Sequence, residues 1–181
     1  YNLAQWYSAG KFAKYKTVSW LEQEDALKIT FAYQAACTPT FEFTVTYTAY
    51  FDGKLGISVS YPGVSGMSDM PIFALDFKIK KQLCNFRYYG FGPDENYSDR
   101  CKGARLGLWE STATENLSGY LNPQECGNRT EVRTLAVHDD MRHGLIFKKS
   151  SAPFEMSVLP YSAYELENAM HLDELPNVRY T

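Results

Sequence analysis

The chain has 181 residues, a formal net charge of -3 and a sequence pI of about 5.6, enough for one domain with its own core. This acidic balance gives no electrostatic case for binding nucleic acid or an anionic membrane. No apolar run approaches the ~20 residues that span a bilayer. The sequence opens on Tyr1 without a signal-like segment, so we expect a processed fragment or a part of a longer protein.

The cysteines predict a reducing compartment. No two of Cys37, Cys84, Cys101 and Cys126 have metal-ligand spacing, so we expect no metal site, free thiols and a cytoplasmic location. Three Asn-x-Ser/Thr sequons point the other way, and we interpret them as coincidence. They begin at Asn96, Asn116 and Asn128.

The first half of the chain alternates apolar and polar residues with the period of a β-strand. The segments "LKITFAY" (27–33), "FEFTVTYTAYF" (41–51) and "LGISVSY" (55–61) predict three strands. Asp52-Gly53 predicts a two-residue hairpin turn with positive φ. One face of this hairpin is expected to be buried. Its inward rows are Leu27, Ile29, Phe31 and Tyr33, and Phe41, Phe43, Val45, Tyr47, Ala49 and Phe51.

The second half predicts further short strands and one helix. The strands are expected at 73–79, 131–137, 144–149 and 154–160. Ser162 and Glu165 form a capping-box pattern, and Leu166, Ala169 and Met170 then fall on one helical face, with Pro176 closing the region. The pattern favours an all-β sandwich or barrel-like domain with one short helix near 163–170.

The segment "YYGFGPDENYSDR" (88–100) combines aromatic residues, glycines, a proline and charges, which is typical neither of a strand nor of a solvated loop. One interpretation is a rigid loop in which Glu95, Asp99 and Arg100 form a carboxylate–guanidinium network under a cover of aromatic rings. The other is a carboxylate pair, Glu95 with Asp94 or Asp99, for glycosidase acid/base chemistry. The residues favour the structural loop.

Three more groups allow both a functional and a structural interpretation. In "NPQECGNR" (122–129) the polar residues could bind sugar hydroxyls or pin the following strand. In "VHDDMRH" (137–143) the histidines and aspartates could contribute to a metal site, but a polar hairpin tip is favoured. The three tryptophans could stack on a sugar, although core packing is favoured for each of Trp6, Trp20 and Trp109.

Three ordered motifs resemble one known family. "YGFGPDENYSDR" (89–100), "GYLNPQECGNRTEVR" (119–133) and "FEMSVLPYSAYELENAMHLDELP" (154–176) are similar to segments in the large C-terminal β domain of family 2 β-galactosidases, which some bacteria carry on a small subunit. The resemblance assigns structural or interface roles to Gly90, Gly92, Pro93, Glu95, Asn96, Tyr97, Asp99, Arg100, Pro123, Gln124, Glu125, Gly127, Asn128, Arg129 and Arg133.

The resemblance implies a β-supersandwich similar to galactose mutarotase, and the retaining hydrolysis of terminal β-galactosides such as lactose. The two catalytic Glu residues of that family lie in a TIM barrel, so no catalytic residue is expected in this chain. The resemblance also implies no cofactor here, whereas Mg²⁺ and monovalent cations belong to the family's catalytic domain. Family segments that flank this sequence are missing, so residues 1–181 are expected to form a single incomplete domain, cut at both ends.

Two rival functions stay open from the sequence. One is a free-standing carbohydrate-binding module, and the other is a mutarotase-like aldose epimerase, which would need a His and a Glu converging on a concave sheet. The resemblance itself implies a TIM-barrel partner, as a domain or a large subunit, in an oligomeric enzyme. The sequence does not identify the preferred galactoside, the assembly state, or whether the barrel shares the polypeptide.

Overall fold

The computed structural model describes residues 3–181, which divide into two compact units. The first unit ends at Leu75 and the second spans Asp76–Thr181. Both are built from antiparallel strands with short helical segments, which confirms the predicted all-β class. The single incomplete domain over residues 1–181 stays a prediction.

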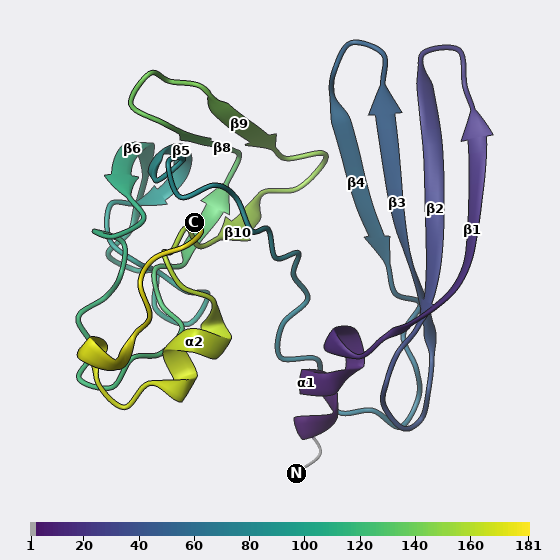
Figure 1. Ribbon diagram of the computed structural model, residues 1–181, viewed down its shortest axis with the longest axis horizontal. Coiled ribbons are helices and arrows are strands. Elements are labelled where there is room, and N and C mark those ends of the chain that lie inside the picture. The colour runs from purple at the N-terminus through teal and green to yellow at the C-terminus, as the bar shows by residue number, and fades with distance from the viewer. Residues whose placement is uncertain (1–2) are drawn as a thin grey trace. The chain divides into compact units, whose positions relative to one another are not determined.

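The first unit is a four-stranded antiparallel sheet with a short helix at one end (Figure 1). Helix α1 (Ala4–Lys11) is followed by β1 (Lys14–Glu22), β2 (Ala26–Gln34), β3 (Glu42–Tyr50) and β4 (Leu55–Ser60), and the strands pair in sequence order. The three strands expected here are confirmed as β2, β3 and β4. Helix α1 and strand β1 were not predicted from the sequence.

The β3–β4 connection is one residue longer than predicted. Tyr50 N–H donates to Lys54 O at 2.9 Å, and Gly53 N–H donates to Tyr50 O at 3.0 Å, which leaves three residues in the loop. Gly53 has φ +88° and supplies the left-handed residue at the third position. The prediction of positive φ is confirmed at Gly53, but the loop has three residues and not the two that were predicted.

The sheet of the first unit has one apolar face and one polar face. Residues that pair across neighbouring strands point to the same side, so the strand registers define both faces. On the polar face, the hydroxyls of Thr30 and Thr46 are 3.0 Å apart. The opposite side, which we call the apolar face, consists of Tyr15, Val18 and Trp20 of β1, Leu27, Ile29, Phe31 and Tyr33 of β2, Phe43, Val45, Tyr47 and Ala49 of β3, and Leu55, Ile57 and Val59 of β4.

The predicted inward residues within β2 and β3 do share the apolar face, but they are not core residues. Phe41 and Phe51 lie outside β3, and Phe51 is 74% exposed in the turn, so its expected inward position was wrong. Phe31, Tyr33, Phe43 and Tyr47 are each only half-buried, and Trp20 is 70% exposed. The expectation that Trp20 packs in a core was therefore wrong. By contrast, Trp6 on α1 contacts Phe41 and Tyr61 near the end of the sheet, with ring centroids 5.9 and 6.1 Å away.

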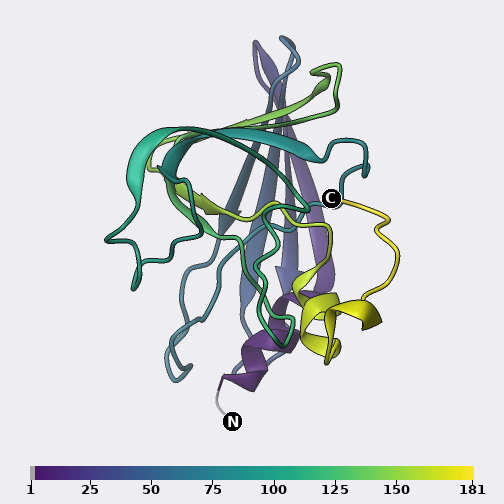
Figure 2. The same ribbon diagram turned by 90° about the vertical axis from the view of Figure 1, so that its left-hand side faces the viewer.

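The second unit contains two small antiparallel sheets. Strands β5 (Asn85–Gly92), β6 (Arg105–Thr112), β8 (Thr134–His138) and β9 (Gly144–Lys148) form one sheet in the order β6-β5-β8-β9. The second sheet pairs β7 (Arg129–Val132) with β10 (Phe154–Met156), and α2 (Ala163–Asn168) and the 3-10 helix η1 (Leu172–Glu174) follow. In both views the β8–β9 hairpin and α2 lie at opposite ends of this unit (Figure 1, Figure 2).

The inward-facing residues of these strands form the core of the second unit. Alternation along β5 and β8 sends every second side chain to the same side. The buried cluster consists of Phe86, Tyr88, Ala113, Val132, Leu135, Val137, Met156 and Val158. Trp109 packs against this cluster and donates from Nε1 to Gly90 O at 3.2 Å, so core packing is confirmed for Trp109.

Several predicted strands of this unit need correction. The alternating segment 73–79 forms no strand in the described part of the chain, and an isolated bridge between Lys80 and Tyr180 follows directly after it. The strand expected at 131–137 is divided at Arg133 into β7 and β8. Glu131, with φ +56°, lies inside β7, where the pairing with β10 shifts register. The strand expected at 154–160 is limited to β10.

The segment 88–92 is a strand, although we expected a loop there. Strand β5 continues to Gly92 and ends directly before Pro93, across a cis peptide bond. Gly90 and Gly92 both belong to this strand. Glycine is required at these two positions, because neighbouring groups leave no room for a side chain. A Cβ on Gly92 would lie 2.2 Å from the Tyr88 hydroxyl, and one on Gly90 would lie 2.9 Å from Val132 Cα.

The helix near 163–170 is confirmed as α2. Glu165 N–H donates to Ser162 Oγ at 3.3 Å, and Ser162 N–H donates to the Glu165 carboxylate at 2.9 Å, which completes the capping box. Leu166 and Ala169 are buried as expected. Met170 is 64% exposed, because the helix ends at Asn168 before its turn can carry Met170 to the apolar side.

Candidate functional site

Two of the sequence motifs meet in space at the end of β5. The first segment (93–100) follows β5 directly, and the second (116–128) connects the end of β6 to the start of β7. Strand β7 lies next to β5. Directly after β7, Arg133 N–H donates to Tyr89 O of β5 at 2.8 Å. We call the two segments together the loop cluster.

Glu95 is the central acceptor of the loop cluster. Its Oε2 accepts hydrogen bonds of 2.8 Å from Ser118 Oγ and 2.8 Å from Gly127 N–H. Its Oε1 accepts from the Tyr120 hydroxyl and, at 3.0 Å, from the Arg100 guanidinium. One carboxylate therefore joins four donors, one from its own segment and three from the second segment.

These donors keep Glu95 ionised. Burial alone would raise the pKa of Glu95, but hydrogen bonds from Tyr120, Gly127 and Ser118, together with the charge of Arg100, hold its pKa below the ordinary value. A general acid for glycoside hydrolysis needs the opposite shift. No recorded interaction joins Glu95 to Asp94 or Asp99, which are both exposed. The arrangement favours the structural interpretation of this carboxylate.

Asn96 forms a second junction beside Glu95, and every polar group of its side chain has a partner. Its Nδ2 donates to Phe91 O at 3.1 Å and to Asp94 O at 2.9 Å. Its Oδ1 accepts from Thr130 N–H at 3.0 Å and from Thr130 Oγ1 at 2.6 Å. Asn96 is only 2% exposed, so these bonds replace water completely.

The backbones of the two segments are also joined directly. Asn96 N–H donates to Asn128 O at 2.9 Å, and Asn128 Nδ2 donates to Asn96 O at 2.9 Å. The buried Arg129 donates from Nε to the Tyr88 hydroxyl at 2.9 Å and from its terminal nitrogen to Gly127 O at 3.1 Å. Arg129 therefore ties the cluster to the core of the unit.

Gly127 fits the cluster through its backbone conformation. It has φ +72°, and a Cβ at this position would lie 2.5 Å from Asn116 Nδ2. The same Asn116 Nδ2 donates to Gly127 O at 3.0 Å and to Val158 O at 3.0 Å. Within residues 3–181, Asn116 Oδ1 is buried without a recorded partner.

The structure brings only part of the predicted residue set together. Glu95, Asn96, Gly127, Asn128 and Arg129 are in mutual contact, as described above. Tyr97 stacks under the Arg100 guanidinium at 4.5 Å, and Arg133 lies 5.7 Å above the Tyr89 ring. Pro123 is buried. The exposed members are Pro93, Asp99, Arg100, Gln124 and Glu125.

Two expectations about this set were wrong. Asp99 does not join the carboxylate–guanidinium network. The Arg100 side chain is 55% exposed, so the aromatic residues do not cover the Arg100–Glu95 pair as expected. Glu125 stays outside the cluster. Its side chain is exposed as a whole, but nearby protein atoms partly desolvate its carboxyl group, and this desolvation together with the Glu167 charge raises its pKa.

The sequence analysis missed two members of the cluster, Ser118 and Tyr120. Both contact Glu95 through side-chain hydroxyls. Tyr120 could have been found, because it occupies the first defined position of the motif that runs to Arg133. The only sequence feature that marked Ser118 was its place in the sequon that begins at Asn116. The sequon residues Asn96 and Asn116 are buried, so both serve as hydrogen-bonding groups of the fold.

The other candidate metal and sugar groups have structural surroundings. Asp139 Oδ1 accepts from the N–H groups of Met141 and His143, each at 2.9 Å, so residues 139–143 form the predicted polar hairpin tip. Within residues 3–181, no group of three or more His, Cys, Asp or Glu side chains gathers as a metal site. The cysteines Cys37, Cys84, Cys101 and Cys126 are free.

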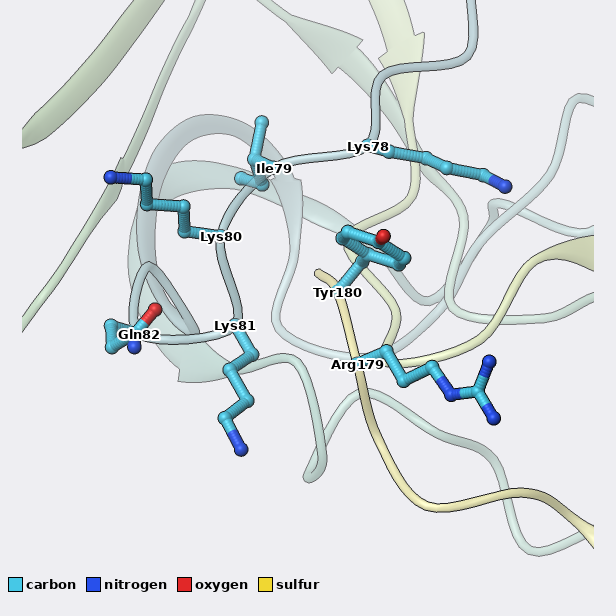
Figure 3. A pocket seen from close by; sticks show the side chains of 7 residues that line it. All are labelled: Lys78, Ile79, Lys80, Lys81, Gln82, Arg179 and Tyr180. Carbon is cyan, nitrogen blue, oxygen red and sulfur yellow. The ribbon is translucent and has the colours of Figure 1, made fainter.

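A shallow pocket of about 410 Å³ lies elsewhere in the second unit (Figure 3). Lys78 and Arg179 extend to the same side of it, with Tyr180 between them, whereas Lys80 points the other way (Figure 3). Both Lys78 and Arg179 act electrostatically on Glu165 and help to lower its pKa, after the larger effect of its hydrogen bonds with Ser162. The negative charge of Glu165 therefore balances part of the positive charge of Lys78 and Arg179 within the unit.

The fold and the loop cluster together define an all-β domain in which a motif carboxylate is held by structural donors. A model of the β-galactosidase small-chain family matches residues 1–181. The chain belongs to this family. Among residues 3–181 we find no helix that is long and apolar enough to cross a membrane.

Curated relatives agree with this assignment. A β-galactosidase of Lactobacillus delbrueckii subsp. bulgaricus is 38% identical over 98% of this chain, and one of Halalkalibacterium halodurans is 37% identical over 100% of it. The β-galactosidase small subunit of Latilactobacillus sakei is 36% identical over 86% of the chain. The chain spans 17%, 18% and 51% of the lengths of these three proteins, respectively.

Proposed function

We propose that this chain is the non-catalytic small-chain part of a β-galactosidase that hydrolyses terminal β-galactosides such as lactose. Its role is to support an active site carried by a TIM-barrel domain or large subunit. The observation that carries this proposal is the environment of Glu95, the most prominent motif carboxylate. All four of its close contacts are donors from the same unit, so it stabilises loops and is not poised for proton transfer.

The proposal that the chain is a β-galactosidase small-chain part also implies its partner, its assembly and its location. The catalytic barrel, on the same polypeptide or on a separate one, supplies the nucleophile and the acid/base. Any Mg²⁺ and monovalent cations of the enzyme belong to that barrel and not to this chain. The assembled enzyme is an oligomer in the cytoplasm. Support for this setting comes from the small-subunit relative and from the free cysteines.

A carbohydrate-binding role has one observation in its favour. A second pocket of about 390 Å³ in the same unit combines aromatic and polar side chains, which is the chemistry that recognises a sugar ring. Its lining includes Phe91, Phe154, Glu131, Glu155 and Ser98. The mutarotase-like alternative has weaker support, because His138 and His143 lie at a hairpin tip with Asp139.

The proposal is tested with the purified chain and a chromogenic β-galactoside. We expect no hydrolysis by the chain alone, and co-purification with a TIM-barrel β-galactosidase chain when the two are expressed together. Hydrolysis that disappears in Glu95→Gln but persists in Asp94→Asn would contradict the non-catalytic assignment. Binding of galactose to the chain alone, lost in Phe154→Ala, would favour the carbohydrate-binding alternative.

A further inference from the structure

The two ends of the second unit begin a β-ladder that breaks off after two residue pairs. Ile79 N–H donates to Thr181 O at 2.9 Å, and Thr181 N–H donates to Ile79 O at 3.2 Å. Directly beside this pair, Lys80 forms an antiparallel bridge with Tyr180 (Figure 3). Two mutual bonds between opposite residues are the hydrogen-bonded pair of an antiparallel ladder. The two ends therefore run antiparallel, and their register is defined.

The residues before Ile79 have the two faces of a β-strand. The Phe77 ring lies 5.4 Å from the ring of Phe147 on β9, and Ile79 packs against the buried core of the second unit. Lys78, between them in the sequence, instead has its Nζ 5.8 Å from the centre of the Tyr180 ring. This alternation is the one that predicted a strand here from the sequence. The segment Asp76–Ile79 therefore has strand-like side-chain contacts without a complete ladder.

The register aligns one backbone edge of this segment with the direction in which the chain leaves Thr181. Hydrogen-bonded pairs recur at every second residue of an antiparallel ladder, so the N–H and C=O of Phe77 point to the same side as those of Ile79. The backbone groups of Lys78 point to the other side. Among residues 3–181, neither backbone group of Phe77 has a recorded hydrogen bond. An unpaired edge of this kind is a template for another extended segment.

We propose that the polypeptide following Thr181 in the natural protein forms a β-strand that pairs antiparallel with Asp76–Lys78. This occupant is favoured over a segment from elsewhere, because the chain already runs along this edge at Thr181 and needs no turn to continue. Its covalent attachment also gives it a high effective concentration at the edge. The proposal rests on the prediction that residues 1–181 belong to a longer polypeptide, and the relatives, of which the chain spans 17%, 18% and 51%, support that prediction. It does not depend on the catalytic assignment.

The register also predicts the side chains of the new strand. Directly opposite residues of an antiparallel pair share one face of the sheet. The residue two positions after Thr181 would lie opposite Phe77, on the face that packs against β9. We expect an apolar residue there, because it would cover Phe77, which is 44% exposed without it. The residue directly after Thr181 would lie opposite Lys78, on the other face.

Amide hydrogen exchange tests this pairing at single residues. Two versions of the protein are compared by NMR, one that ends at Thr181 and one that continues for about six natural residues, an average strand length. We expect the Phe77 N–H to exchange about tenfold more slowly in the longer version, because it forms a hydrogen bond there. The Lys78 N–H is the matched control, since it points away from the new strand and its rate should not change. Equal rates along β8 in both versions show that both are folded.

A pair of proline variants of the longer version separates strand pairing from simple covering of the edge. A proline two residues after Thr181 removes the N–H that would donate to Phe77 O, so the Phe77 exchange rate should return to that of the shorter version. A proline three residues after Thr181 removes an N–H that faces away, so Phe77 should stay protected. Equal Phe77 rates in the two versions, equal effects of the two prolines, or a natural protein that ends at Thr181 would overturn the proposal.

Discussion

The backbone N–H of Gly127 donates a 2.8 Å hydrogen bond to Glu95 Oε2, a residue 32 positions earlier in the chain. The bond joins the segment after β5 to the segment before β7, and neither segment has a ladder of its own at this point. Ser118 and Tyr120 bond to the same carboxylate. The charge of this one side chain therefore contributes to the order of the loop cluster, beside the bonds of Asn96 and Arg129.

Replacing Glu95 with Gln should destabilise the second unit by about 2–3 kcal/mol, because an amide nitrogen would face donors that now bond to a carboxylate. Chemical denaturation followed by far-UV circular dichroism measures this change. Asp94→Asn is the matched control, since Asp94 is exposed and adjacent, and we expect a change within about 0.5 kcal/mol. Equal effects of the two variants would show that the hydrogen bonds of Glu95 contribute nothing specific.

Acidification should remove the contribution of Glu95. The folded state holds the pKa of Glu95 below its ordinary value, so this stabilisation is complete above the unfolded pKa, near 4.3. It is lost as the pH falls through the lower, folded pKa. The difference in unfolding free energy between the parent and Glu95→Gln should therefore be largest near pH 7 and shrink below about pH 4. A difference in unfolding free energy that stays constant from pH 7 to pH 3 would contradict a stabilising contribution from ionised Glu95.

Gly127→Ala should cost about 2 kcal/mol or more, because the added Cβ meets Asn116 Nδ2 in a backbone conformation that favours glycine. Gly103→Ala is the control, since a Cβ at Gly103 would meet no atom within 4 Å and its φ is not in the left-handed region. Thermal unfolding of both variants measures the contrast. Similar melting temperatures for the two would mean that the cluster relaxes around the new methyl group.

Arg100→Ala should lower the melting temperature by less than Glu95→Gln does. The sequence analysis placed Arg100 in a network covered by aromatic rings, but the Arg100 side chain is 55% exposed. An ion pair with an exposed guanidinium contributes little to stability, because water solvates the charge in both states, and salt screens the remaining attraction. Differential scanning calorimetry in low and high salt would measure both parts. A larger loss for Arg100→Ala than for Glu95→Gln would restore the earlier interpretation.

The hydrophobic pattern predicted β2, β3 and β4, which pair with their sequence neighbours, but not β1, which pairs with β2. Strands β2, β3 and β4 form hairpins between adjacent segments, so local alternation and turn chemistry were sufficient. The capping box of α2 is likewise local and was confirmed. Strand β5 was missed because its glycines resemble loop residues in the sequence. Only the packing of Val132 and Tyr88 shows that these positions must lack a side chain.

The motifs identified most residues of the loop cluster, but not Ser118 or Tyr120, and not the roles of its members. The sequence by itself determined the family resemblance, the alternating faces of the first sheet and the residue types gathered around Glu95. The tertiary structure decided that Glu95 bonds to Ser118, Tyr120 and Gly127, that Asp99 stays in solvent, and that Arg100 bonds to Glu95 from an exposed position. The physical reason is that hydrogen-bond partners and burial depend on contacts between distant segments, which a local pattern does not encode.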